Sequence, residues 1–505
     1  MHIGQILRFA AQKVPDRTAI IYDKQRFTYR ELNDRVNQAA HGLLQMGLNA
    51  GDKVAVLLLN SHCFAELYFA TARVGGVFTP VNFRLAPPEV AFILNHSEAR
   101  FLFYGAAFDE LIGAIRPRLQ FVERFVRVRT GAGSASLDYE DLLSESGTGE
   151  PEAEVSGNDV CQLMYTSGTT GRPKGALITH QNVVWNLFNT ILGRDEKEGE
   201  TSVVVGPLFH TAPLNNHFSI RVAMAGTTIF LNTFEPRRLM EIIQEERVTV
   251  ISGPPTMFHL LFALPDLARY DTGSVTKCTT GASILPEHTK RRILEVFPNV
   301  EGVYDIYGCT EASPSVTTLK GKDSIRKQEC VGLPLPFVQV RIVDDDDRDV
   351  PCGKVGELIC RGPNVMKGYY KDETGTREAL KGGWLHTGDL ARMDQEGFLY
   401  IVDRKKDMII TGGENVYPRE IEEVLFLHPK IQEAAVIGIP DPVWGESVKA
   451  VVVLKEGETM KQEEVIEYCK IHLASYKKPK FVEFAEKLPK SASGKVLKNL
   501  LKGSC

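Results

Sequence analysis

Residues 160–176 read VCQLMYTSGTTGRPKGA, an apolar run followed by a loop rich in glycine and hydroxyl side chains. Glycines let a backbone approach an anion closely, consecutive hydroxyl groups donate hydrogen bonds, and Lys174 adds a positive charge. The loop is not a Walker A motif, because Gly168 and Gly171 are too close together and Gly175 follows the lysine where that motif has Ser or Thr. The pattern predicts a cradle for a triphosphate, with an ordinary surface loop of the same composition as the alternative.

The chain on both sides of this loop alternates helical and strand-like patterns. Apolar residues recur at helical spacing over residues 29–46, and a second helix is expected at 236–247. Buried strands are expected at the short apolar runs 54–59, 203–205, 227–231, 248–251 and 300–306. Strands that alternate with helices are typical of a layered α/β fold.

The pattern changes near Gly332. From there to about Asp403 the apolar runs, such as 356–361, predict the hairpins of a compact β-rich, barrel-like subdomain. The remainder of the chain predicts a small α+β domain of its own. The segment 131–156 is rich in Ser, Gly and Glu and is interpreted as a surface connection.

Composition excludes several classes of protein. The length of 505 residues suits roughly two to four domains. The 59 Lys and Arg residues against 64 Asp and Glu residues give a net charge of −5, which argues against nucleic-acid binding. The nine cysteines never form a Cys-x-x-Cys pair, so neither a zinc module nor a disulfide framework is indicated. The sequence lacks both a secretory signal and an apolar run of the roughly 20 residues that a transmembrane segment needs. We therefore expect a cytoplasmic chain.

The loop at 165–176 resembles the signature of the adenylate-forming superfamily, which contains acyl-CoA synthetases, peptide-synthetase adenylation domains and beetle luciferases. Further motifs of that family follow in its order: YGCTE at 307–311, TGD at 387–389, DRKKD at 403–407 and PKSASGK at 489–495. The resemblance covers essentially the full chain. It implies an N-terminal AMP-binding domain with a β-rich subdomain, a hinge and a mobile C-terminal domain, at 1–403 (subdomain about 332–403), 404–406 and 407–505.

The resemblance implies an AMP-forming carboxylate–CoA ligase. Such an enzyme uses ATP and Mg²⁺ to convert an acid into an acyl-adenylate and then transfers the acyl group to CoA. Length and motif wording are most similar to medium- and long-chain fatty acyl-CoA synthetases. An aryl or cyclic carboxylic acid CoA ligase is the nearest alternative, and a luciferase-like oxygenase is an alternative of a different class. The oligomeric state stays open.

The family motifs also imply a set of residues that hold ATP. The phosphates would be bound by Thr166, Ser167, Gly168, Thr169, Thr170 and Lys174. Glu311 matches the Mg²⁺ ligand, and Thr310 matches a donor to the α-phosphate. Contacts to the purine and the acyl carbonyl are implied for Asp305, Tyr307, Gly281, Ala282 and Ser283. Asp389 matches the ribose-binding carboxylate, and Arg404 adds a cation beside it.

Other matches concern the second substrate and the change between the two steps. Lys495 resembles the lysine that bridges the substrate carboxylate and the α-phosphate, and Lys406 lies at the hinge position. Gly412 and Gly413 would let the pantetheine of CoA pass close to the backbone. His210 falls where the family has a gate beside the carboxylate.

Two further predictions rest on position or composition. Trp185, Phe209 and Asn216 are candidate walls of the acyl pocket. The stretch 116–129 mixes arginines with apolar residues and suggests weak peripheral contact with anionic lipid, with an exposed strand face as the alternative.

Overall fold

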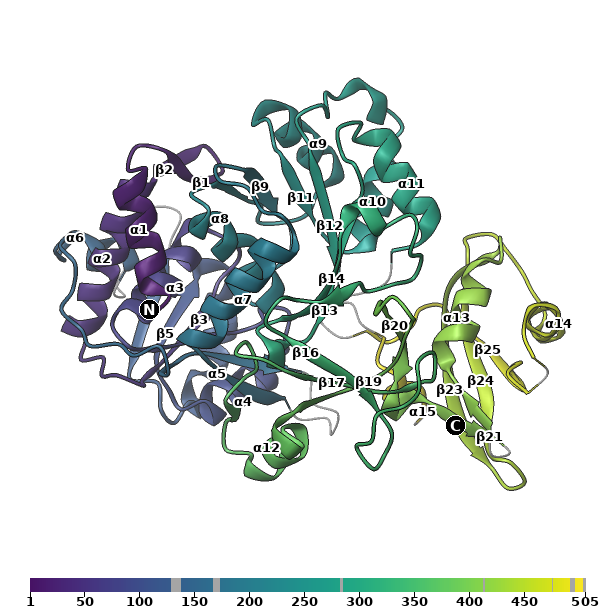
Figure 1. The fold of residues 1–505 in the computed structure, drawn as a ribbon. Coiled ribbons are helices and arrows are strands. Elements are labelled where there is room, and N and C mark those ends of the chain that lie inside the picture. Colours follow the sequence, from purple (N-terminus) through teal and green to yellow (C-terminus); the bar gives the residue numbers. More distant parts are fainter. Residues whose placement is uncertain are drawn as a thin grey trace. The chain divides into compact units, whose positions relative to one another are not determined.

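The computed structural model describes residues 1–128, 138–166, 173–281, 285–411, 414–474, 476–490 and 496–502 (Figure 1). Contacts divide the chain into two compact units. Unit 1 comprises Met1–Val340 and Cys360–His386, and unit 2 comprises Arg341–Ile359 and Thr387–Cys505. The predicted β-rich subdomain at about 332–403 is therefore divided, with 341–359 and 387–403 in unit 2 and the rest in unit 1. Its assignment to the N-terminal domain stays a prediction. The hinge at 404–406 stays a prediction, because it concerns motion.

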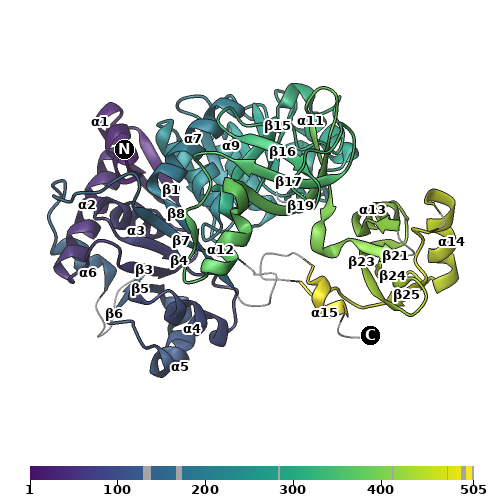
Figure 2. The same cartoon turned by 60° about the horizontal axis from the view of Figure 1, so that its bottom comes forward.

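Unit 1 contains two large sheets. The first has the order β15-β14-β13-β12-β11-β9-β10-β1-β2. Its strands are β1 (Thr18–Tyr22), β2 (Gln25–Thr28), β9 (Thr201–Val204), β10 (Thr227–Phe230), β11 (Val250–Ser252), β12 (Lys277–Gly281), β13 (Val303–Gly308), β14 (Ser315–Leu319) and β15 (Leu333–Pro334). The second sheet has the order β18-β8-β7-β4-β3-β5-β6, and its strands lie side by side in Figure 2. They are β3 (Lys53–Leu57), β4 (Val77–Pro80), β5 (Ala99–Gly105), β6 (Arg124–Val128), β7 (Val160–Thr166), β8 (Lys174–Thr179) and β18 (Gly368–Tyr369).

Alternating side chains along these strands build three apolar layers. In β9, Val203 packs in a core with α9, α10 and α11, and Val204 packs in the core between the two sheets. In β3, Val56 faces that same central core, whereas Leu57 faces α4 and α5. Because successive side chains of a strand point to opposite faces, each sheet needs helices on both sides. The predicted layered α/β fold is therefore confirmed.

The helices of unit 1 fill these layers, and Figure 1 draws α9, α10 and α11 beside β11 and β12. They are α1 (Gly4–Lys13), α2 (Tyr29–Gln45), α3 (His62–Arg73), α4 (Pro87–His96), α5 (Asp109–Ile115), α6 (Tyr139–Ser144), α7 (His180–Gly193), α8 (Ser219–Ala223), α9 (Pro236–Glu245), α10 (Pro255–Phe262), α11 (Glu287–Val296) and α12 (Glu373–Ala379). The start of α2 is fixed by sequence, because the Thr28 hydroxyl accepts from Glu31 N and the Glu31 carboxylate accepts from Thr28 N.

One sequence interpretation was incomplete. The segment 131–156 contains α6, which buries Tyr139, Leu142 and Leu143 and starts where the Asp138 side chain accepts from Glu140 N. The Ser, Gly and Glu residues that dominate the composition of this segment obscured the short apolar face of the helix.

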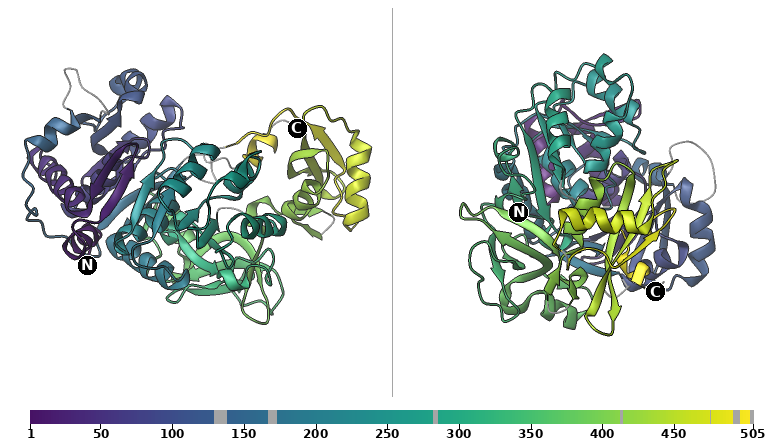
Figure 3. Two further views of the ribbon diagram at one scale, coloured as in Figure 1. Left: turned by 90° about the horizontal axis from the view of Figure 1, so that it is seen from above. Right: turned by 90° about the vertical axis from the view of Figure 1, so that its right-hand side faces the viewer.

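Unit 2 contains two smaller sheets. One has the order β16-β17-β19-β20, formed by β16 (Gln339–Val343), β17 (Gly356–Arg361), β19 (Leu385–Met393) and β20 (Leu399–Arg404). The other is built from β21 (Ile409–Thr411), β22 (Glu414–Val416), β23 (Ile431–Asp441), β24 (Gly445–Leu454) and β25 (Phe481–Phe484). Its helices are α13 (Pro418–Phe426), α14 (Gln462–His472) and α15 (Lys498–Lys502); α14, yellow in Figure 3, lies against this sheet. Among the described residues of both units, no helix has the length and apolar character that crossing a bilayer requires.

Candidate active site

The predicted purine-binding residues lie at one edge of the nine-stranded sheet. β12 and β13 are parallel, and their register pairs Thr280 with Asp305 and Gly281 with Ile306. Asp305 is buried and Tyr307 is partly exposed. Ligands of open α/β sheets bind at the carboxyl ends of the strands, which is where these residues stand. Ala282 and Ser283 lie outside the described residues.

The chain turns sharply after β13 to present Thr310 and Glu311. A Cβ atom at Gly308 would overlap the carbonyl oxygen of Pro314, so this turn requires glycine. Thr310 and Glu311 then form a single 3-10 turn that ends at Ser313, whose φ of 68° lies in the left-handed region. The backbone thus delivers the predicted metal ligand within a few residues of the predicted purine contacts.

The predicted phosphate loop is anchored by a tight strand pair. β7 and β8 are antiparallel, and Thr166 pairs with Lys174 at their open end. The residues between them that we assigned to the phosphates, Ser167, Gly168, Thr169 and Thr170, lie outside the described residues. Lys174 Nζ forms an ion pair with Asp372 Oδ2 at 3.0 Å. This lysine is about a quarter exposed, so its ammonium group is accessible to a ligand.

Tyr369 connects the lysine to the glutamate. Lys174 Nζ lies 5.0 Å from the centre of the Tyr369 ring, and the Tyr369 hydroxyl donates to Glu311 Oε1 at 2.8 Å. Burial and the neighbouring Glu311 carboxylate raise the pKa of Tyr369, which keeps the hydroxyl protonated as a donor. The Gly375 N–H and then Lys174 lower the pKa of Asp372, so this carboxylate stays charged. A cation and two carboxylates are thereby held around one tyrosine.

His210 lies just before a π-helix at Ala212–Phe218. Its ring centre is 4.4 Å from that of Phe209, which in turn meets Phe83 edge-on at 5.1 Å. Burial, followed by the charge of Arg84, lowers the pKa of His210 to about 4. The imidazole is therefore neutral at pH 7 and forms part of an aromatic cluster. π-Helical turns are frequent at functional sites.

The polar residues of this π-helix serve the fold. Asn216 is buried, accepts from Asn186 Nδ2 at 2.8 Å and donates to Ser315 Oγ at 2.7 Å. Asn215 is likewise buried and bonded to Gln162. The prediction of Asn216 as a pocket wall is thus wrong, because its side chain is used to fix the segment that follows Glu311.

Two other sequence interpretations also change. Trp185 packs against Phe188 and Phe337, both well exposed, so it belongs to a surface aromatic cluster. In the basic stretch 116–129, Arg127 is paired with Asp109 and Arg116 lies over the Phe125 ring at 4.2 Å. These two arginines are therefore engaged within the fold, and the predicted lipid contact has less free charge to use.

The predicted ribose-binding pair lies in unit 2. β19 and β20 pair Asp389 directly with Arg404, and Arg404 Nε lies 2.6 Å from Asp389 Oδ1. Asp389 is buried while Arg404 is about a third exposed. These two residues belong to separate sequence motifs, and the β19–β20 hairpin brings them into contact.

The hinge and CoA residues are only partly described. Lys406 is exposed within a 3-10 turn, Lys405–Asp407, that follows β20. Its neighbour Lys405 is paired with Glu357 at 3.1 Å and Asp345 at 2.8 Å. Gly412, Gly413 and Lys495 lie outside the described residues.

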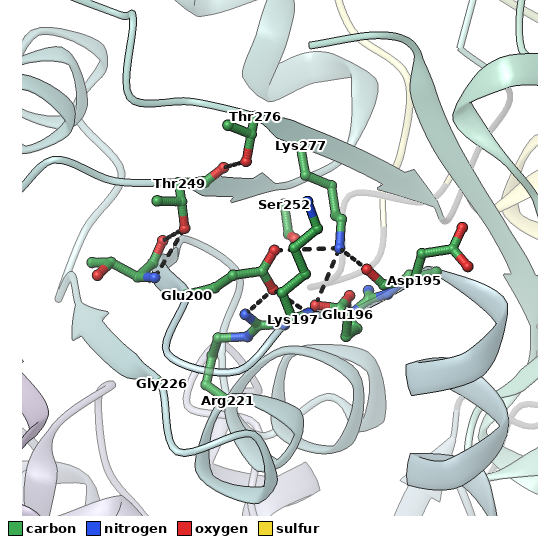
Figure 4. Close-up of polar contacts among 12 residues, drawn as sticks. Asp195, Glu196, Lys197, Glu200, Arg221, Gly226, Thr249, Ser252, Thr276 and Lys277 are labelled. Carbon is green, nitrogen blue, oxygen red and sulfur yellow. Dashed lines mark hydrogen bonds and ion pairs between the residues drawn. The ribbon is translucent and has the colours of Figure 1, made fainter. Parts of the chain in front are cut away.

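A buried ionic cluster, not predicted from sequence, occupies the opposite edge of the nine-stranded sheet (Figure 4). It lies at the amino ends of β9 and β12, where Arg221 pairs with Glu196 and, at 2.5 Å, with Glu200. Arg194 pairs with Glu196 at 2.6 Å, and Lys277 lies 3.4 Å from Glu200. Three cations thus face two carboxylates, and burial lowers the pKa of Lys277 to about 8.

Sequence reasoning also missed Tyr369 and Asp372. Asp372 stands three residues before Gly375, which is an ordinary helix-cap spacing, and its side chain does accept from Gly375 N at 2.7 Å. Tyr369 comes into place through β18, which pairs with β8. No local signal marks either residue, because their partners Lys174 and Glu311 are distant in sequence.

Comparison with known proteins now identifies the family of the chain. Residues 7–370 match the model of the AMP-binding enzyme family, and residues 420–495 match the AMP-binding enzyme C-terminal domain. A feruloyl-CoA synthase of Amycolatopsis sp is 39% identical over 97% of this chain and 96% of its own length. A long-chain-fatty-acid–CoA ligase of Mycobacterium tuberculosis is 36% identical over 99% and 98%.

A solved structure of a related enzyme has a similar fold over nearly its whole length. The o-succinylbenzoate coenzyme A synthetase of Bacillus subtilis, in complex with ATP and magnesium ion, has a TM-score of 0.87 and 31% identity. The match covers 98% of this chain and 99% of that one.

Proposed function

The chain belongs to the AMP-binding enzyme family, and from this premise we propose that it activates a hydrophobic carboxylic acid with ATP and transfers it to free CoA. The reaction class is that of an AMP-forming acid–thiol ligase, which releases AMP and pyrophosphate. The observation that carries the proposal is the continuous segment 305–311. It takes the chain from Asp305 and Tyr307 at a strand end, through the turn at Gly308, to Thr310 and Glu311.

The described residues fit ATP and Mg²⁺. Glu311 offers a carboxylate oxygen of the kind that Mg²⁺ prefers, and Lys174 supplies a point charge for phosphate oxygens. Thr310 Oγ1 accepts from the Thr211 hydroxyl at 3.3 Å, which orients it beside Glu311. Bound Mg²⁺ would neutralise phosphate charge, while these side chains align the nucleotide.

A carboxylate is a poor acyl donor, so the site must assist its attack on a phosphate that is also anionic. Cations and oriented donors placed where negative charge accumulates provide that assistance. Lys174 and Lys495 are the cations that we assign to this task. His210 is neutral, and attack by a carboxylate removes no proton. We therefore assign His210 to lining the acyl site.

In the second step, transfer of the acyl group to CoA, we propose that the acyl-adenylate stays bound while different residues of unit 2 contact it. We propose that movement about Lys406 withdraws Lys495 and brings Gly412 and Gly413 toward the acyl-adenylate. Asp389 and Arg404, paired within unit 2, hold the ribose in this scheme. Free CoA is the proposed acceptor, and the cytoplasm is the proposed location.

The acid is proposed to be a medium- or long-chain fatty acid. An aryl acid is the second candidate, and the aromatic cluster of Phe83, Phe209 and His210 favours it because planar rings pack well on such surfaces. Relatives of both kinds are found, a feruloyl-CoA synthase and a long-chain-fatty-acid–CoA ligase.

Pyrophosphate release tests the substrate. The purified protein is assayed with ATP, Mg²⁺ and acetate, octanoate, palmitate, benzoate or cinnamate, each with and without CoA. The fatty-acid proposal predicts the highest kcat/KM for octanoate or palmitate. A preference for cinnamate or benzoate would establish the aryl alternative, and no release with any acid would contradict the ligase proposal.

Substitutions test the assignment of the two steps. Lys495→Ala should abolish acyl-adenylate formation but spare thioester synthesis from supplied acyl-adenylate. Lys406→Pro should do the reverse, because proline stiffens the backbone at the hinge. Equal loss of both half-reactions in the Lys495 variant, or undisturbed CoA transfer in the Lys406 variant, would contradict these roles.

A further inference from the structure

Tyr369 stands between the two charged groups that the proposed function assigns to phosphate and metal. Its hydroxyl donates to Glu311 Oε1 at 2.8 Å, and its ring lies beneath Lys174 Nζ at 5.0 Å. Lys174 begins β8, whereas Glu311 lies in the turn after β13 of the other sheet. A single side chain therefore contacts both groups from a third segment.

The backbone holds Tyr369 firmly. β18 pairs Tyr369 with Ala176, and Tyr370 N donates to Gly175 O at 2.8 Å. Tyr369 N also donates to Thr376 Oγ1 at 2.9 Å. On the other side, Met366 N donates to Glu311 O at 2.8 Å. The segment 366–376 is thus fastened both to the strand that carries Lys174 and to the turn that carries Glu311.

We infer that Tyr369 is a positioning residue that sets the Glu311 carboxylate for Mg²⁺ and the Lys174 ammonium for the phosphates. The inference rests on the proposed function. A carboxylate that ligates a metal needs its orientation fixed by a hydrogen bond from behind, and loss of such an outer partner typically weakens metal affinity 10- to 100-fold. The ring adds a cation–π contact that keeps the lysine over the same site.

The neighbouring Tyr370 is a matched control. Its hydroxyl donates to the Glu98 carboxylate at 2.7 Å, and Lys53 Nζ lies 5.0 Å from its ring centre. The same bond type and the same cation–ring distance thus occur one residue later, with partners that have no proposed role in ATP binding. Tyr370→Phe therefore reproduces the structural cost of losing a tyrosine hydroxyl in this segment.

Nucleotide-binding measurements test the positioning role of Tyr369 without relying on catalytic activity. The full chain is titrated calorimetrically with α,β-methylene-ATP, which cannot form an adenylate, at several Mg²⁺ concentrations. Tyr369→Phe should raise the Mg²⁺ concentration for half-maximal nucleotide binding roughly tenfold, with affinity restored at saturating Mg²⁺. Tyr369→Leu, which also removes the ring, should bind the nucleotide more weakly even at saturating Mg²⁺. Tyr370→Phe should match the unsubstituted protein.

A Glu311→Gln variant distinguishes failure of this inference from failure of the proposed site. If Glu311→Gln leaves the Mg²⁺ dependence unchanged, the metal role proposed for Glu311 is wrong. If Glu311→Gln shifts it and Tyr369→Phe does not, the inference about Tyr369 is overturned while the site stands. Equal shifts in Tyr369→Phe and Tyr370→Phe would also overturn it, because they would indicate a general loss of packing.

Discussion

Unit 1 carries two clusters of charge that differ in almost every physical respect. The cluster of Figure 4 lies at the amino ends of β9 and β12, is buried, and satisfies its carboxylates with three cations. The pair Lys174–Asp372 lies in the candidate active site, and its side chains are about a quarter to a third exposed. Burial makes an ion pair costly to break, whereas exposure makes it easy to exchange for a ligand. The first cluster is therefore expected to govern stability and the second to govern binding.

The largest expected effect is on stability, from Glu196→Gln. This change leaves Arg194, Arg221 and Lys277 facing one carboxylate, and removing one partner of a buried pair typically costs about 3–5 kcal/mol. Thermal and denaturant unfolding of the full chain measure it. Glu198→Gln is the control, because Glu198 is an exposed partner of Lys13 and its loss should leave the unfolding midpoint unchanged. Similar midpoints for both variants would remove the distinction between the clusters.

Lys174→Met is expected to act on binding instead. Loss of one group that stabilises developing charge typically lowers the rate by roughly 100-fold or more, and here kcat/KM for ATP should fall to that extent. The unfolding midpoint should stay nearly constant, because exposed ion pairs contribute about 0–1 kcal/mol. A large loss of stability with little change in ATP kinetics would show that Lys174 is structural.

Lowering the pH should reduce the free energy of unfolding through a buried histidine beside Arg194 of the buried cluster. Burial and Arg194 lower the pKa of His217 to about 3, below the usual value of 6.5. Between these pH values the unfolded chain binds a proton that the folded chain does not, so the free energy of unfolding falls as pH decreases, by about 1.4 kcal/mol per pH unit for this group. His217→Gln should show a smaller loss of stability between pH 6.5 and pH 5, measured by denaturant unfolding. An unchanged pH slope would contradict a neutral His217.

The smallest effect is expected for Asp372→Asn. The amide oxygen can still accept from Gly375 N, so only the charge that competes for Lys174 is lost. Binding of α,β-methylene-ATP should tighten about two- to fivefold, the range of an exposed ion pair. Glu373→Gln removes an exposed charge one residue later and should leave affinity unchanged. Weaker binding in Asp372→Asn would indicate that Asp372 orients Lys174 in the bound state.

The fold class and the family were predictable because their signals are local. The strands β17 and β25 fall on apolar runs, and the family motifs are continuous strings. The register that joins Asp389 to Arg404 agrees with their common assignment to the ribose, although that role stays a prediction.

What sequence could not provide depends on contacts between distant segments. The side chain of Asn216 is polar whether it faces a substrate or a buried serine, and only the packing of α7, the π-helix and β14 decides between them. The five charges of the buried cluster come from three separate elements or loops and have no common spacing. Tyr369 likewise has no motif that links it to Glu311.

The two-residue strand β18 also constrains when the site can form. Gly368 pairs with Leu177, and the hydroxyl of Tyr370 reaches Glu98 across a separation of 272 positions. Closing so long a loop costs conformational entropy before any contact offsets it, so such contacts form late in folding. During synthesis, the sheet that carries Lys174 is translated long before the segment that fixes the orientation of its ammonium group. A nascent chain that ends before residue 368 therefore has most of its core and an incomplete nucleotide site.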